Sequence, residues 1–418
     1  MTNKFKLLTL SDHPLVSSGV ATQTKYILEG LLKTGKYQIL SLGGAMSHQD
    51  YRPQKIQEYG DDWTIYPING YGDQNLVREF IEREKIDAIW FMTDPRFFGW
   101  LAEMSDEIRD RGIPILYNHV WDNYPIPQFN KAFYHSFDYI GCISKLTHDI
   151  VKQLGCSEFS DYIPHAVDVN IFKPFTKQEI LKHRELTFKQ HKDKFIVFYN
   201  SRNARRKMTS DVVKVFKMFI DKNNLHDKVF LFMHTDPFDQ EGANLVETAK
   251  MLGLRNDQLA FSSARVTPEQ MAIFYNTADV TMNISNNEGF GLSCLESLSC
   301  GTPAIVCETG GLQDQIKDEN GFEFGVSVKP ATRSLTGSQQ IYYILDDRCS
   351  DEDLVAALEK MYQLSFDERK ALGQKAHEWT LRAFKISDVV TKWENVIEKY
   401  IQKFRKNGYS GRVKLVKV

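Results

Sequence analysis

The stretch that decides the fold reads Glu288-Gly-Phe-Gly-Leu-Ser-Cys-Leu-Glu296-Ser-Leu-Ser-Cys-Gly-Thr-Pro303, and an apolar strand candidate, Ala304–Val306, follows it. The Gly-Phe-Gly turn opens a helix, so free backbone N–H groups stand beside two glutamates that are eight positions apart. Carboxylates accept hydrogen bonds from hydroxyl groups, and free N–H groups face anions. The stretch therefore favours a ligand with both sugar hydroxyls and a diphosphate; the alternative is a glycine turn that caps a core helix with two solvated glutamates.

Short apolar runs alternate with amphipathic stretches on both sides of this segment. The strand candidates are Phe5–Leu10, Ile86–Met92, Ile113–Tyr117 and Tyr139–Ile143 in the first half, and Phe195–Tyr199, Val229–Met233, Leu259–Phe261, Val280–Ile284 and Ala304–Val306 in the second. Such alternation predicts parallel sheets covered by helices on both faces. We therefore expect an α/β protein with two similar domains, and ligands beyond the carboxyl ends of the strands, at a topological switch point.

The last part of the chain carries a helical signal. Past Gly325 we expect no further strand, and after an irregular stretch we predict helices over 352–362 and 386–404. In the second of these helices, apolar residues recur at helical spacing and form one broad face that must be buried against another part of the protein.

A basic segment, Arg202-Asn-Ala-Arg-Arg-Lys207, follows the strand candidate Phe195–Tyr199. An Arg fork and a Lys point charge can together neutralise a departing diphosphate without a metal. That spacing makes Arg202 and Lys207 candidate phosphate ligands. Arg205 and Arg206 are either further ligands or part of a solvated loop.

Glu288–Pro303 resembles the E-x7-E donor-site signature of retaining GT-B glycosyltransferases of the family-four type. The basic segment is similar to the phosphate-binding segment of that family, with Ser201 and Met208 in place of two glycines. The resemblance implies two Rossmann-like, doubly wound domains that face each other across a cleft, with a C-terminal crossover helix. It also implies the domain limits, namely an acceptor domain over 1–175, a donor domain over 176–384, and over 385–418 a helix that returns to the N-terminal domain and a basic tail.

The resemblance also assigns roles to side chains. Glu288 is expected to hold hydroxyls of the donor sugar, Glu296 the ribose, and Arg202 and Lys207 the diphosphate. His119, at the end of a strand candidate, matches a histidine that contacts the donor sugar, although a lone histidine is as often structural.

Backbone groups complete the site that the resemblance implies. Those of Gly289, Phe290, Gly291 and Leu292 line the sugar and phosphate pocket. Gly19 lies in a glycine loop that approaches the phosphate, or in an ordinary strand-to-helix turn. Backbone groups of Arg265 and Val266 contact the base.

The activity that the resemblance implies is that of a retaining hexosyl- or glycosyltransferase (EC 2.4). A nucleotide diphosphate sugar is the co-substrate, no other cofactor and no divalent metal are needed, and the leaving phosphate helps to deprotonate the acceptor. The expected acceptor is a glycan or a lipid-linked glycan. The Asn203–Lys207 run also resembles bacteriophage glycosyltransferases, some of which modify DNA bases, and this alternative stays open.

Other classes of protein stay in competition with this interpretation. A non-catalytic nucleotide-sugar-binding protein would keep the same ligands, and a nucleotide-sugar epimerase or a phosphorylase could use a related fold. We find no segment typical of the pyridoxal lysine site that a phosphorylase needs.

The amino-acid composition limits the partners and the cellular location that we expect for the protein. The 418 residues include 52 Lys and Arg and 54 Asp and Glu, so the net charge of −2 provides no overall field for nucleic acid or an anionic membrane. Six scattered cysteines form no CxxC pair, which favours reduced thiols and a cytoplasmic location. No apolar stretch approaches the ~20 residues of a transmembrane helix, but a peripheral membrane contact stays open.

Overall fold

The computed structural model describes residues 4–407, which form two compact units. Unit 1 contains the chain up to Trp121, then Ile126–Ala166, and again the chain from Ile386. Unit 2 contains Asp122–Pro125 and Val167–Lys385. The expected basic tail beyond the last helix, residues 408–418, lies outside the described residues.

Unit 1 is built on an eight-stranded sheet with the order β3-β4-β2-β1-β5-β6-β7-β8. All neighbouring strands are parallel except β3 and β4. The strands are β1 (Phe5–Asp12), β2 (Tyr37–Gly44), β3 (Gln54–Lys55), β4 (Trp63–Pro67), β5 (Ala88–Thr93), β6 (Ile115–His119), β7 (Tyr139–Cys142) and β8 (Ser160–Tyr162). The helices are α1 (Gly19–Lys33), α2 (Gln74–Glu84), α3 (Gly99–Glu103), α4 (Ser105–Asp110), α5 (Lys131–His135), α6 (Lys145–Val151) and α15 (Ile386–Asn407).

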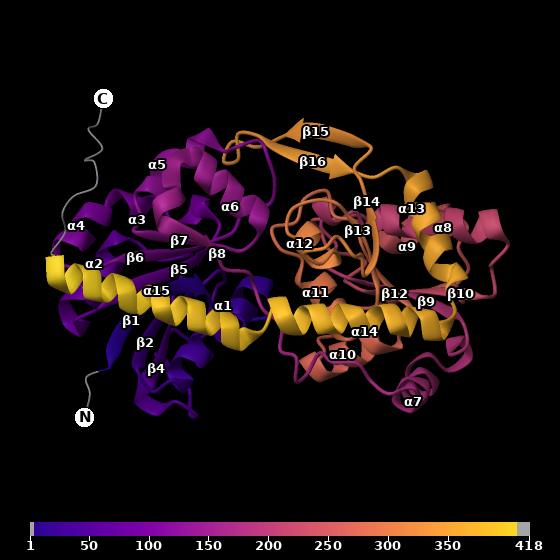
Figure 1. Ribbon diagram of the computed structural model, residues 1–418, viewed down its shortest axis with the longest axis horizontal. Coiled ribbons are helices and arrows are strands. Elements are labelled where there is room, and N and C mark those ends of the chain that lie inside the picture. Colours follow the sequence, from indigo (N-terminus) through magenta and orange to yellow (C-terminus); the bar gives the residue numbers. More distant parts are fainter. Residues whose placement is uncertain (1–3, 408–418) are drawn as a thin grey trace. The chain divides into compact units, whose positions relative to one another are not determined.

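Helix α15 completes the core of unit 1, although more than two hundred residues separate it from the rest of that unit. It lies along the unit beside α1 (Figure 1). Its Trp393 is fully buried and makes edge contacts with Trp90 of β5 and Tyr139 of β7. Gly141 leaves room for this indole, since a Cβ there would lie 2.6 Å from Trp393 Cζ2. The apolar face that the sequence predicts is therefore buried against the first domain, as expected.

Unit 2 is built on a six-stranded parallel sheet with the order β11-β10-β9-β12-β13-β14. The strands are β9 (Phe195–Asn200), β10 (Val229–His234), β11 (Leu259–Ser262), β12 (Val280–Asn283), β13 (Ala304–Cys307) and β14 (Gly325–Val328), and a separate hairpin contains β15 (Thr332–Thr336) and β16 (Ile344–Arg348). The helices are α7 (Lys177–Phe188), α8 (Thr209–Asn223), α9 (Leu245–Met251), α10 (Pro268–Thr277), α11 (Leu292–Ser299), α12 (Leu312–Ile316), α13 (Asp351–Gln363) and α14 (Phe366–Ala383).

Two hydrophobic clusters of unit 2 include residues of its sheet. In the larger cluster, Phe216 of α8 and Leu358 of α13 are buried with sheet residues such as Val197. In the smaller cluster, Leu298 of α11 and Ala376 of α14 are buried with residues of β13. The sheet is thereby covered by helices, as the alternation of strands and helices predicts.

The expectation of no strand beyond Gly325 is wrong. Gly325–Val328 forms the edge strand β14, and the polar stretch after it forms the β15–β16 hairpin. All five residues of β15 are exposed, so this strand lacks the apolar pattern that marks a buried one. An 18-residue helix, α14, was also not predicted.

Candidate active site

The candidate ligands lie at the switch point of the unit 2 sheet. Strands β9 and β12 are neighbours in the sheet; from β9 the chain continues to β10 and β11 on one side, and from β12 to β13 and β14 on the other. A crevice forms outside the carboxyl ends of strands where the strand order reverses in this way. The basic segment follows β9 and Glu288 follows β12, so topology alone brings these two segments together.

A short 3-10 turn, Arg205–Lys207, gives the basic segment its shape. Met208 ends this turn in the left-handed conformation, with φ of 54°, and α8 begins at the next residue. Glycine adopts this conformation without strain, which accounts for the glycine that the family pattern has at this position. The loop keeps its form with a methionine, and Lys207 can therefore reach the carboxyl ends of the strands.

Lys207 and Glu288 form a buried ion pair. The Lys207 ammonium group donates to Glu288 Oε2, and Ser285 Oγ lies 3.2 Å from the same oxygen. Glu288 is only 7% exposed. Burial alone would raise the pKa of Glu288, but Lys207 and Arg206 hold this pKa below its ordinary value. The structure thus brings together a cation from after β9 and a carboxylate from after β12, as the sequence predicts.

Arg206 rather than Arg202 is the second cation near Glu288. The Arg206 guanidinium lies 3.9 Å from Glu288 Oε1 and 3.7 Å from Asp122 Oδ2, and it donates to the carbonyl of Asn287 at 3.0 Å. Arg202 instead donates to the carboxylate of Asp239 at 2.7 and 3.1 Å, and its side chain is 65% exposed.

The glycine turn after Glu288 points the start of α11 toward the same place. Gly291 caps this helix with φ of 94° and ψ of 60°, a conformation that a larger residue adopts only with strain. The first turn of a helix has N–H groups without intrahelical acceptors, and they favour anions. The backbone of Gly289–Leu292 therefore adds an anion-binding edge next to the Lys207 cation.

A second glycine pair, Gly310-Gly311 after β13, supports this turn, and sequence reasoning missed it. The N–H of Gly311 donates to the carbonyl of Glu288 at 3.0 Å. A Cβ at Gly310 would overlap that same carbonyl oxygen, and one at Gly311 would lie 2.6 Å from the Cα of Phe290. The signal that could have revealed them is a Gly-Gly pair directly after a buried strand.

Glu296 lies on α11 and belongs to a separate polar chain. Asn200 donates to the hydroxyl of Tyr275 at 2.8 Å, and Tyr275 donates to Glu296 Oε2 at 2.8 Å. Burial raises the pKa of Glu296 to about 7, although the hydrogen bond from Tyr275 acts in the opposite direction. The sequence analysis singled out neither Tyr275 nor Asn200, which ends β9.

The β15–β16 hairpin is anchored next to the glutamate turn. The N–H of Asp347 donates to the carbonyl of Asn286 at 2.8 Å. The Asp347 carboxylate accepts hydrogen bonds from Asn123 at 2.9 Å, Thr309 at 2.8 Å and Arg333 at 2.8 Å. These bonds join the hairpin, the loop after β13 and the short Asp122–Pro125 segment of unit 2, so they hold the backbone just before Glu288.

Three other predicted site positions belong to other elements of the two units. Gly19 begins α1 in unit 1, where Ser18 caps the helix and donates to Asp12 at 2.6 Å. Arg265 and Val266 lie in the loop between β11 and α10, before the capping residue Thr267. Their expected contacts with phosphate and base stay predictions.

His119 ends β6 in unit 1 and is fully buried. Its Nε2 lies 2.9 Å from the hydroxyl of Tyr134, and burial lowers the pKa of His119 to about 3. Its Nδ1 has no hydrogen-bond partner among residues 4–407. The imidazole is therefore neutral, and its contact with a donor sugar stays a prediction.

The arrangement in unit 2 can hold a diphosphate by charge and by helix N–H groups, and a sugar by carboxylates. Within residues 4–407 no group of three or more His, Cys, Asp or Glu side chains has an arrangement that could hold a metal ion. In the same part of the chain, no helix is long and apolar enough to cross a membrane.

Two doubly wound parallel sheets, and a final helix that returns to the first of them, define a GT-B protein. Solved structures with this fold agree over almost the whole chain. Sucrose-phosphate synthase from Thermosynechococcus elongatus aligns with a TM-score of 0.74 at 15% identity, over 96% of this chain and 100% of that one. The Anabaena protein HepE, solved in complex with UDP and glucose, aligns with a TM-score of 0.70 at 13% identity, over 95% and 100%.

The second half of the chain is similar to a known protein family. Residues 182–379 match the model of the family described as glycosyl transferases group 1. The matched region is slightly less than half of the chain, and it lies in the unit that carries Lys207, Glu288 and Glu296.

Curated relatives match over shorter stretches. Alpha-monoglucosyldiacylglycerol synthase of Streptococcus pneumoniae is 28% identical over 258 residues, which are 60% of this chain and 54% of that protein. D-inositol 3-phosphate glycosyltransferase of Streptosporangium roseum is 28% identical over 160 residues, 36% of this chain and 34% of that protein. The chain thus matches about half of the length of the first relative and a third of the second.

Proposed function

We propose that this protein transfers a sugar from a nucleotide diphosphate sugar to an acceptor hydroxyl, with retention of anomeric configuration and without a metal. The observation that carries the proposal is the buried Lys207–Glu288 pair at the switch point of unit 2, beside the start of α11. A family model that covers this unit supports it. We also propose that the protein acts in the cytoplasm, where thiols stay reduced.

The chemistry follows from where charge develops. As the glycosidic bond breaks, the sugar becomes oxocarbenium-like and negative charge grows on the departing diphosphate. Lys207 and the N–H groups of α11 stabilise that charge, while Glu288 accepts hydrogen bonds from sugar hydroxyls. The departing phosphate takes the proton of the acceptor hydroxyl. Arg206 is a second cation for the diphosphate, and Arg202 becomes a third if the ligand displaces Asp239.

For the acceptor, we propose a glycan or a lipid-linked glycan. The names of the relatives support a hydroxyl acceptor in general, since one is named for a glucosyldiacylglycerol, which is a lipid, and the other for inositol 3-phosphate. Neither name involves a nucleic acid, so the relatives give no support to a DNA base as acceptor.

The deciding experiment is a screen of UDP-, GDP- and ADP-sugars with the purified protein. A cognate donor at about 100 times its dissociation constant should stabilise the protein by roughly 2.7 kcal/mol. Release of the free nucleotide, with and without added glycolipid acceptors, then reports turnover. Stabilisation without release under any acceptor condition would favour the alternative of a binding protein, and neither effect with any donor would contradict the proposal.

The role of Glu296 predicts a pH dependence of nucleotide binding. The ionised carboxylate is the form that accepts hydrogen bonds from both ribose hydroxyls, and with a pKa of about 7 the free protein loses this form as pH falls. If only the ionised form binds, the affinity for UDP should fall about tenfold between pH 8 and pH 6. Calorimetry at several pH values measures this change.

The matched control is Glu296→Gln. This variant has no ionisable carboxyl group at position 296, but the UDP phosphate still titrates. Its pH profile should lack the tenfold component, and Glu288→Gln should keep it. The stability of the free protein changes with pH in the opposite direction. Because the pKa of Glu296 in the folded protein is raised above 4.5, Glu296 stabilises the fold fully below that pH and loses its contribution as pH rises through about 7. Identical binding profiles for wild type and Glu296→Gln would exclude the ribose role.

Metal independence predicts that turnover survives chelation. The cationic groups around Glu288 take the place of a divalent ion, so EDTA in excess should leave the rate of nucleotide release within about twofold of the untreated rate. Complete loss of activity that manganese or magnesium restores would show that the diphosphate needs a metal in this protein.

A further inference from the structure

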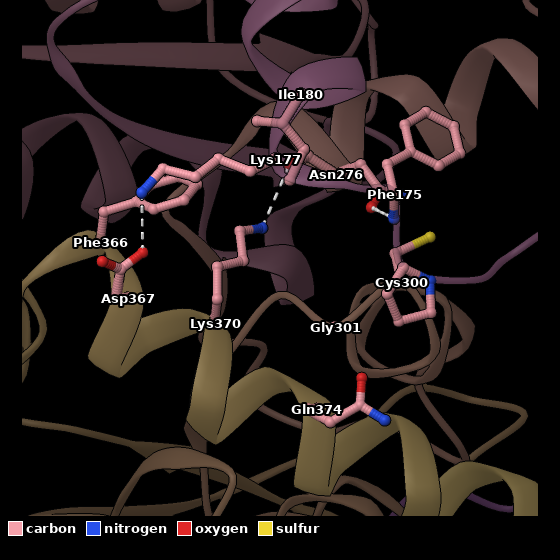
Figure 2. Close-up of a pocket in the computed structure, with 11 residues that line it drawn as sticks. Phe175, Lys177, Ile180, Asn276, Cys300, Gly301, Phe366, Asp367, Lys370 and Gln374 are labelled. Carbon is pink, nitrogen blue, oxygen red and sulfur yellow. Dashed lines mark hydrogen bonds and ion pairs between the residues drawn. The ribbon is translucent and has the colours of Figure 1, made fainter.

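Unit 2 contains a pocket of about 170 Å³ at the opposite end of α11 from the glutamate turn. It lies between α7, α14, the last turn of α10 and the residues that follow α11, which are Cys300 and Gly301 (Figure 2). Helix α11 has eight residues, so it spans about 12 Å. The pocket is therefore distinct from the Lys207–Glu288 site.

Part of the pocket wall is apolar. Pro174, Phe175 and Ile180 line it from the segment that leads into α7, and Phe366 lines it from α14. A cavity of roughly 150 Å³ is large enough for a six-carbon ring. The apolar wall can thus take a small organic group.

Lys370 supplies the polar end of this pocket. Its ammonium group points toward α10 and donates to the carbonyl of Asn276 at 3.3 Å (Figure 2). An ammonium group has three donors, and no ion pair of Lys370 is recorded within residues 4–407. At the rim, Lys177 pairs with Asp367 at 3.0 Å, so that second lysine is already neutralised.

The two ammonium groups also face one aromatic ring. Lys177 Nζ lies 5.2 Å and Lys370 Nζ 5.6 Å from the centroid of the Phe366 ring. A ligand anion between the lysines would contact the edge of the apolar wall at the same time. Burial lowers the pKa of Lys370 to about 8, an effect that Asp279 opposes and Arg184 reinforces, and a bound anion would reverse the shift.

The surroundings of Lys370 carry an excess of positive charge. Behind the pocket, Arg184 and Arg369 share a single carboxylate, that of Asp279, at 2.6 and 2.8 Å. Lys177, Lys370 and the rim carboxylate of Asp367 are added to this group. The total is then four cations and two carboxylates, which is an excess of two positive charges. A phosphate monoester carries about −1.5 to −2 charges at pH 7, which balances this excess.

We propose that the pocket binds a small organic phosphate, with the phosphate on Lys370 and the organic group against Phe366 and Ile180. The apolar wall selects for an ester over the free ion, and the charge excess selects for a phosphate over a neutral ligand. Nothing in the sugar transfer uses this pocket, so such a ligand would bind in addition to the donor.

The test is calorimetric titration of the full chain with phenyl phosphate in the presence of saturating UDP, which blocks the donor site. We expect saturable binding of one phenyl phosphate per chain. Lys370→Met keeps the length of the side chain and removes its charge, so it should weaken binding about tenfold or more. Lys375→Met, on the same helix but over the ring of Phe322, is the matched control and should leave the affinity within about twofold.

A second variant keeps the test decisive if Lys370→Met does not fold. Phe366→Leu should weaken the binding of phenyl phosphate by more than it weakens the binding of inorganic phosphate, because only the ester uses the apolar wall. Displacement of phenyl phosphate by UDP, or equal effects of the two lysine variants, would overturn the proposal. If the protein binds phenyl phosphate through Lys370 but does not bind UDP, the pocket proposal stands and the proposed function is contradicted.

Discussion

Lys207→Met is expected to lower the rate of sugar transfer by about 10²–10³-fold, the usual cost of losing one preorganised donor to developing negative charge. The variant keeps the aliphatic stem of the side chain but has no charge to place on the departing diphosphate. Substrate affinity should change less than turnover, because the charge on the leaving group is larger in the transition state than in the bound donor. Steady-state nucleotide release and a UDP titration together measure the two effects.

The effect of Lys207→Met on folding stability must be separated from its effect on turnover. Removing one partner of a buried ion pair can cost about 3–5 kcal/mol, since Glu288 is then left with only Arg206 nearby. The double variant Lys207→Met/Glu288→Gln should regain part of that stability and none of the turnover. Lys214→Met, on α8 and paired with Asp211 and Asp351, serves as control and should retain wild-type turnover. Near wild-type rates in Lys207→Met would remove this lysine from the reaction.

Removal of α15 is expected to unfold the first domain. The helix buries seven large apolar side chains in the core of unit 1, namely Val389, Val390, Trp393, Ile397, Tyr400, Ile401 and Phe404. At about 1.5–3 kcal/mol for each, their burial contributes some 10–20 kcal/mol, which exceeds the net stability of about 5–15 kcal/mol that a domain usually has. A chain truncated after Lys385 should therefore lose the hydrogen-exchange protection of β1 and β5, while the strands of unit 2 keep theirs.

A point variant gives the graded form of this prediction. Trp393→Ala should lower the free energy of unfolding of unit 1 by about 3–5 kcal/mol, because the cavity it leaves lies against Trp90 and Tyr139. Asn395→Ala, on the exposed side of the same helix, should change it by less than about 0.5 kcal/mol. Unchanged protection of β1 and β5 in the truncated chain would mean that the core of unit 1 does not need this helix.

The sequence predicts the position of those residues that the order of strands in the sheet brings together. The strands of unit 2 from β9 to β13 are mostly apolar runs, with Thr281 inside β12 as an exception, and their order places the basic segment next to Glu288. Strand β2 was not predicted, because its centre carries a polar residue: Ser41 is buried and accepts hydrogen bonds from Thr9 at 2.8 Å and Trp63 at 3.0 Å. Polar residues satisfied in this way interrupt the hydrophobic pattern without interrupting the strand.

The details of the site depended on contacts that spacing does not encode. The choice between Arg202 and Arg206 follows from Asp239, which holds the first, and from the 3-10 turn that directs the second toward Glu288. The link from Asn200 through Tyr275 to Glu296 joins three segments of the chain. Neither Asn200 nor Tyr275 has a local pattern that distinguishes it from a core or cap position.

The placement of α15 has a consequence for the order in which the protein is made. A ribosome that has completed Ala166 must still add 219 residues before it reaches Ile386, and at about 5–20 residues per second this takes roughly 10–40 s. Throughout that interval the nascent first domain exposes the sheet surface that Trp393 and its neighbours later cover. By its end, the second domain has all of its own strands. Vectorial synthesis thus favours completion of the second domain before the first, and the unfinished face of the first is a natural binding site for chaperones.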